Sequence, residues 1–182
     1  LAAVELNLSC PNLQKKVLVA QDAAVTAAVV RRVKAVSRYP VIAKLSPNVT
    51  DITAIALAAE EAGADGLSMV NTFAAMAIDV KKRRSKIGNF TGGLSGPAIR
   101  PIAVRMVCEA AARVKIPIIG MGGIACADDA LEFLIAGASM AAVGTYNFVN
   151  PRAPLEVFEG IKAYMKANKM TDIRELIGSI QR

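Results

Sequence analysis

Short apolar runs alternate with longer amphipathic, alanine-rich segments along the 182 residues of the chain. The short runs are apolar on both faces, which is typical of parallel strands covered by helices. They predict strands over 3–8, 40–45, 66–70, 116–120 and 139–143. The amphipathic segments predict helices near 21–37, 51–63, 98–114, 127–137 and 152–167, with a last helix near 171–180.

Alternation of strands and helices predicts an α/β fold built on a parallel sheet, either doubly wound or a (β/α)8 barrel. A closed barrel needs eight βα units and about 250 residues, whereas about five units are visible here. The segment 74–96 is too long for a simple βα loop and predicts an insertion, such as a hairpin, after the third strand. The chain starts with Leu1 and enters a strand almost at once, so we expect a single-domain fragment over 1–182.

Composition narrows the chemistry of the chain. It has no histidine, which excludes a Ser-His-Asp triad, a Cys-His dyad and a histidine-ligated metal within it, and we expect no metal site. Its three cysteines form no CxxC pair, which favours a reduced, cytoplasmic setting. The formal charge of +7 suits a phosphate-bearing ligand or an acidic partner, and only 4% aromatic residues argue against nucleic acid. The uncharged stretch 133–151 contains glycines, a proline and polar residues, so we expect no membrane span.

Small or polar residues follow each of the five predicted strands. The carboxyl ends of parallel strands meet at one edge of a sheet, so we expect these residues to share one site. They are Asn7 to Asn12 at the end of the first strand and beyond it, Lys44 within the second strand with Ser46 to Asn48 after it, Asn71 and Thr72 after the third, Gly122 and Gly123 after the fourth, and Gly144 and Thr145 after the fifth.

Two of these groups can hold an anion or a charge. The pairs Gly122-Gly123 and Gly144-Thr145 let backbone N–H groups approach a phosphate, although either pair alone could be a tight turn. Lys44 lies in the apolar run VIAKLS and should face a ligand or a carboxylate, unless its side chain extends to solvent at a strand edge.

The other polar groups are a thiol and three amides. Cys10 follows the first strand, where a thiol can exchange a proton, although a lone cysteine is more often an inert core residue. Asn7, Asn12 and Asn71 can each donate and accept, which suits a planar ligand with alternating carbonyl and N–H groups, or a set of turn residues.

The sequence resembles the dihydroorotate dehydrogenase family, and most closely its NAD-linked, two-subunit class 1B. The similar segments run in the same order along nearly the whole chain: NLSCPN (7–12), KLSPNVTDI (44–52), ADGLSMVNT (64–72), TGGLSGPAIRPIA (91–103), IPIIGMGGI (116–124) and AVGTYNF (142–148). The resemblance implies an FMN-binding (β/α)8 TIM barrel, present here as its C-terminal part without the first strands. It also implies a cytoplasmic flavoprotein oxidoreductase of pyrimidine biosynthesis.

The resemblance also implies roles for individual residues. Cys10 matches the base that takes the C5 proton of dihydroorotate while hydride passes from C6 to FMN. The residues matching those that hold the pyrimidine are Asn7, Asn12, Asn71 and Thr72. The residues matching FMN contacts are Asn7, Lys44, Val70, Gly96, Gly122, Gly123, Gly144 and Thr145.

The resemblance further implies a separate electron-transfer subunit with FAD and a 2Fe–2S cluster, since three cysteines are too few to hold such a cluster here. We expect a homodimer or a heterotetramer. One departure concerns the loop 13–20, which has none of the glycines usual in the family's mobile lid. The alternatives are a dihydropyrimidine dehydrogenase-like FMN enzyme and a non-catalytic barrel fragment that binds a phosphate ligand.

Overall fold

A parallel sheet forms the centre of the chain in a computed structural model that describes residues 1–9 and 19–181. Within these ranges its strand order is β1-β2-β3-β8-β9, and all four pairings are parallel. The strands are β1 (Val4–Asn7), β2 (Val41–Lys44), β3 (Gly66–Met69), β8 (Ile118–Met121) and β9 (Met140–Ala142). Four of these strands lie inside the predicted ranges, and β8 extends one residue beyond its predicted range. The predicted parallel sheet is therefore confirmed.

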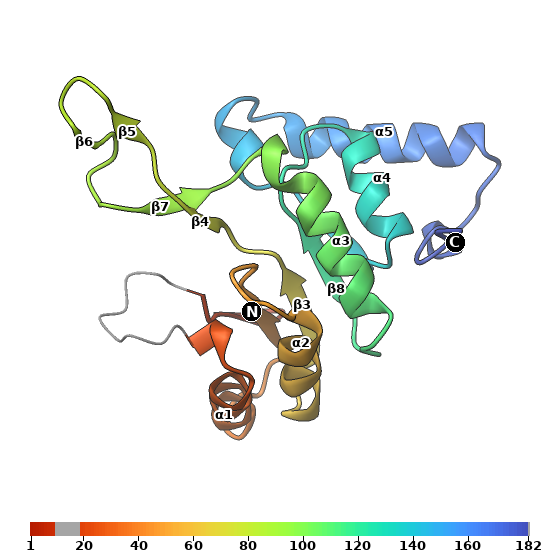
Figure 1. The fold of residues 1–182 in the computed structure, drawn as a ribbon. Helices are drawn as coiled ribbons and strands as arrows, with labels where there is room; N and C mark the ends of the chain where they lie inside the picture. Colours follow the sequence, from red (N-terminus) through yellow and green to blue (C-terminus); the bar gives the residue numbers. More distant parts are fainter. Residues whose placement is uncertain (10–18, 182) are drawn as a thin grey trace.

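A helix follows every strand of the sheet. The helices are α1 (Ala23–Lys34), α2 (Ile52–Glu61), α3 (Arg100–Ala111), α4 (Ala127–Ile135) and α5 (Ala153–Ala167). Each packs beside the next in chain order, and Figure 1 shows α1 against α2 and α3 beside α4. Short 3-10 turns are η1 (Val19–Gln21), η2 (Pro97–Ile99), η3 (Thr145–Phe148) and η4 (Ile173–Glu175).

Local sequence signals define the ends of the helices. Asp22 accepts a hydrogen bond from the Val25 N–H at the start of α1, and Asp51 accepts one from Thr53 at the start of α2. Gly63 (φ +94°) follows α2 and Gly137 (φ +116°) follows α4, in backbone conformations that favour glycine.

The two faces of the sheet have different environments. Ala43, Leu67 and Ile118 stand next to one another in register, are fully buried and face the helices. Lys44, one residue further along β2, therefore points to the opposite face. Gly120 shows how closely the helix side is packed, because a Cβ there would lie 2.7 Å from the Phe133 ring of α4. The hydrophobic core thus lies between sheet and helices and leaves the other face for a site.

An arm leaves the sheet directly after β3. It consists of two successive antiparallel pairs, β4 (Phe73–Ala75) with β7 (Gly92–Leu94) and β5 (Ile78–Asp79) with β6 (Arg84–Ser85). Figure 1 shows it extending away from the sheet, in yellow-green. The predicted insertion over 74–96 is therefore confirmed, and its form is a long hairpin.

The predicted last helix near 171–180 is wrong. Only the short turn η4 forms there, because Asp172 and Glu175 cap each other's backbone and close a single turn. Gly178 (φ +70°) then donates its N–H to the Leu134 carbonyl at 3.0 Å, while Leu176 packs against Leu131 and Leu134. Tertiary contact with α4 therefore replaces helical continuation. Over the ranges that the structure describes, no helix has the length and apolar character needed to cross a membrane.

The carboxylate of Asp65 joins α1 to the start of β2. Its Oδ2 accepts from Lys34 Nζ and from the Val41 N–H, each at 2.7 Å. The Lys34 hydrogen bond, followed by that of Val41, holds the pKa of Asp65 below its ordinary value of 3.8. The contribution to stability is therefore present above pH 3.8 and is lost as the pH falls through the lower, folded-state pKa.

We predict that Asp65→Asn in the full-length protein lowers the free energy of unfolding by about 0.5–1 kcal/mol at pH 7, a small value because the group is solvent-screened. The difference should shrink in urea unfolding curves as the pH is lowered below 3.8. Glu61→Gln, on the exposed end of α2, is the matched control. An equal loss at neutral and at acidic pH would contradict the interpretation.

Candidate functional site

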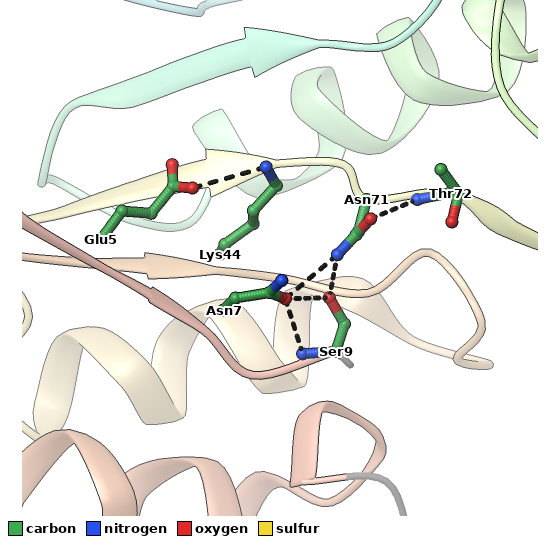
Figure 2. Close-up of polar contacts among 6 residues, drawn as sticks. All are labelled: Glu5, Asn7, Ser9, Lys44, Asn71 and Thr72. Carbon is green, nitrogen blue, oxygen red and sulfur yellow. Dashed lines mark hydrogen bonds and ion pairs between the residues drawn. The ribbon is translucent and has the colours of Figure 1, made fainter. Parts of the chain in front are cut away.

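Amide and hydroxyl groups from β1 and β3 meet at the carboxyl edge of the sheet. Asn71 Nδ2 donates to Asn7 Oδ1 at 3.2 Å and to Ser9 Oγ at 2.5 Å. Asn71 Oδ1 accepts the N–H of Thr72 at 2.8 Å. Figure 2 shows this network, which joins residues 62 and 64 positions apart in the chain. The structure thus brings Asn7 and Asn71 together through one direct hydrogen bond.

Lys44 points to the same side and pairs with a carboxylate. Its Nζ lies 3.4 Å from Glu5 Oε1, with side chains 23% and 38% exposed (Figure 2). The sequence predicted that Lys44 faces a ligand or a carboxylate, and the carboxylate is now identified. Glu5 was missed, although it lies two residues before Asn7 in the same strand and therefore on the same face.

The glycine segments after β8 and β9 form a backbone cradle. Gly122 (φ +127°) and Gly123 (φ +81°) adopt conformations that favour glycine, and a Cβ on Gly123 would lie 2.7 Å from the Gly96 carbonyl oxygen. A Cβ on Gly144 would instead meet open space. Among the described residues, no acceptor takes the backbone N–H of Gly123 or Thr145. Backbone N–H groups of this kind can bind an anion, and the predicted phosphate site at these residues stays a prediction.

The lysine, amides and glycine segments surround one cavity of about 300 Å³. This volume lies at the lower end of the range of small-molecule and cofactor sites. The predicted residues that line it are Lys44, Val70, Asn71, Thr72, Gly96, Gly122, Gly123, Gly144 and Thr145. Asn7 does not line the cavity itself but accepts a hydrogen bond from Asn71, which does. Cys10 and Asn12 lie outside the described residues, and the roles of all these residues stay predictions.

A buried carboxylate holds the backbone that follows the Gly122-Gly123 segment. Asp129 is 5% exposed and accepts from the backbone N–H groups of Ala125 at 2.8 Å and Cys126 at 3.1 Å. It also pairs with Arg100, whose Nε lies 3.3 Å from Glu132. These contacts of Asp129 and Arg100, called the brace below, join the start of α3 to the start of α4. It was missed in the sequence, because an Asp in the first helical turn is usually only a cap.

Asn48 links the loop after β2 to the base of the arm. Its Nδ2 donates to the Thr72 carbonyl at 3.0 Å, and its Oδ1 accepts the N–H of Ala74 at 2.8 Å. The position of Thr72 beside the cavity therefore depends on Asn48 as well as on Asn71. The sequence indicated that Asn48 is a polar residue at a strand end, but it did not predict these hydrogen bonds.

Parallel strands, outer helices and a glycine-lined cavity at the carboxyl edge of the sheet define part of an α/β barrel. A family model described as "Dihydroorotate dehydrogenase" matches residues 1–165. The chain belongs to this family, and the predicted membership is confirmed.

Comparison with curated relatives shows which members of the family the chain is similar to. The chain is 54% identical over 179 residues to the "Dihydroorotate dehydrogenase B (NAD(+)), catalytic subunit" of Lachnoclostridium phytofermentans, covering 98% of this chain and 60% of the relative. It is 54% identical over 183 residues to the protein of the same name from Desulforudis audaxviator, covering 100% of this chain and 60% of the relative. The chain thus spans about three fifths of the length of these relatives.

A solved structure supports the fold. The chain superimposes on DHODH from Eimeria tenella, crystallised in complex with ferulenol, with a TM-score of 0.80 and 24% sequence identity. The match covers 98% of this chain and 54% of the Eimeria chain. The predicted barrel fold, present in part, is therefore confirmed.

The brace behind the glycine segment leads to a stability prediction. Asp129→Ala in the full-length protein should lower the free energy of unfolding by about 2–4 kcal/mol, because it leaves two backbone donors without their acceptor and removes one of the two carboxylates paired with Arg100. Asp128→Ala, at the neighbouring exposed position, is the control and should change it by less than about 0.5 kcal/mol. Urea unfolding measures both. Equal small effects would show that the brace contributes little.

Proposed function

We propose that the complete protein of which this chain is part oxidises dihydroorotate to orotate in pyrimidine biosynthesis, with FMN as its cofactor. The observation that carries the proposal is one cavity that joins a lysine, an amide cluster and two glycine segments in a chain of this family. The similar curated relatives are named as catalytic subunits of this enzyme.

The cavity offers backbone donors suited to the phosphate of FMN. The free N–H groups of Gly123 and Thr145 would bind the phosphate, and the open space beside Gly144 leaves room for it. Val70 and Gly96 also line the cavity, where they would contact the flavin ring. Asn7, hydrogen-bonded to Asn71, would contact both cofactor and substrate. FMN, when bound, supplies the hydride acceptor.

The amide cluster would orient the substrate. Asn71 and Thr72 border the cavity and, together with Asn7 and Asn12, would bind the carbonyl and N–H groups of the pyrimidine. The Cys10 thiolate would take the proton from C5 as the C6 hydride leaves, so that the C5–C6 bond becomes double. Lys44 would stabilise the negative charge that the hydride brings to the cofactor.

The proposal includes a second polypeptide. The names of the relatives as catalytic subunits, with NAD(+) as acceptor, support an electron-transfer subunit in the complete enzyme. That subunit would hold FAD and a 2Fe–2S cluster. The assembly would be a homodimer or a heterotetramer, located in the cytoplasm.

Replacement of Cys10 tests the reaction. The full-length protein should purify with bound yellow flavin and form orotate from dihydroorotate. Cys10→Ala should keep the flavin and lose roughly 100-fold or more in kcat, the usual contribution of a general base. Orotate formation measured by absorbance checks both. A flavin-loaded Cys10→Ala protein as fast as the wild type would overturn the assignment, and faster turnover of dihydrouracil would favour the dihydropyrimidine dehydrogenase-like alternative.

The open space at Gly144 tests the cofactor site. Gly144→Ala should raise the dissociation constant for FMN about tenfold, since the added methyl group enters the space proposed for the phosphate. The fold should tolerate it, because no neighbouring atom lies within 4 Å of the place that the new Cβ would take. Gly88→Ala, equally open but on the arm, is the control. Flavin fluorescence titration measures both, and equal affinities would place the phosphate elsewhere.

A further inference from the structure

The cavity contains one pair of opposite charges. Of the side chains that line it in the described part of the chain, Lys44 and Glu5 are the charged ones. Their 3.4 Å separation makes them an ion pair, and both come from neighbouring parallel strands, β1 and β2. The pair is neutral as a whole, so the wall of the cavity carries no net charge from side chains.

The strand register places Glu5 on the same face of the sheet as Lys44. Asn7 is the register partner of Lys44, and Glu5 lies two residues earlier on the same face of β1. On the other side, the register partner of Lys44 is Ser68, whose fully buried hydroxyl has no hydrogen-bond partner among the described residues. The lysine thus extends toward the carboxylate, although a neutral polar group lies on the adjacent strand.

We propose that Glu5 is a positioning residue that holds the Lys44 ammonium at the cofactor and sets how strongly it stabilises the reduced flavin. This inference rests on the proposed FMN function. A hydride carries two electrons and one proton, so its transfer adds one negative charge to the bound flavin. Lys44 favours that charge, and the Glu5 carboxylate offsets part of this effect while fixing the direction of the lysine side chain.

The test uses the full-length, FMN-loaded protein. Glu5→Gln keeps an oxygen acceptor for Lys44 but removes the negative charge. The two-electron reduction of the flavin should then become more favourable by on the order of tenfold, which corresponds to a midpoint potential about 30 mV more positive. Reductive titration against a redox dye measures the potential. Glu109→Gln, which disrupts the exposed surface pair with Arg105, is the control and should leave it unchanged.

Opposite and combined variants extend the test. Lys44→Met leaves the Glu5 carboxylate alone in the cavity, so the potential should shift in the negative direction and flavin should bind more weakly. Adding Glu5→Gln to Lys44→Met removes the unpaired charge and should return both properties toward the wild type. This rescue provides a readout even if Glu5→Gln alone retains too little flavin for titration.

Each outcome decides the inference. A Glu5→Gln potential equal to that of the Glu109→Gln control, or a double variant no better than Lys44→Met, would overturn it. Both results require wild-type protein that binds flavin and forms orotate. If the wild type did neither, the proposed function itself would fail, so the two failures are distinguishable.

Discussion

Parallel pairing of the five strands is the constraint on which the site depends. Because β1, β2, β3, β8 and β9 run in one direction, residues from distant segments finish at one edge of the sheet. Asn7 and Asn71 come within hydrogen-bonding distance only through this register. Successive side chains of each strand point to opposite faces of the sheet. One face therefore supplies the apolar core, and the other supplies the charged and polar wall of the cavity. A slip of one residue in β2 would place Lys44 in the core and Ala43 in the cavity.

The loops at this edge are held by side chains that accept backbone hydrogen bonds. Asp129 fixes the N–H groups after the glycine segment, and Asn48 fixes the start of the arm beside Thr72. Both use short polar side chains, which lose little conformational entropy when they are ordered. The cavity walls are therefore supported from outside, while the N–H groups of Gly123 and Thr145 remain available to a ligand. Under the proposed function, these donors would be in place for the phosphate without rearrangement of the loops.

Periodicity and strand-end composition were sufficient to predict the sheet, five helices, the arm and the group of cavity residues. Those features arise from local signals, such as the capping Asp51 and the apolar runs. The turn at Ile173–Glu175 could not be predicted, because Gly178 and Leu176 adopt their conformation through contact with α4. Glu5 was also missed. An acidic residue within a strand carries no signal of its own until the register shows which cation it faces.

The Glu5–Lys44 pair explains how a lysine can stand in an otherwise apolar strand. An ammonium group at this depth would be costly to bury without a counter-charge, and the carboxylate on the adjacent strand supplies one within the protein. The lysine is thereby oriented without help from a ligand, and less conformational entropy is lost when one binds. The same carboxylate limits the attraction of the cavity for anions in general. Under the proposed function, discrimination among anions would then depend on the directional backbone N–H groups, which recognise shape as well as charge.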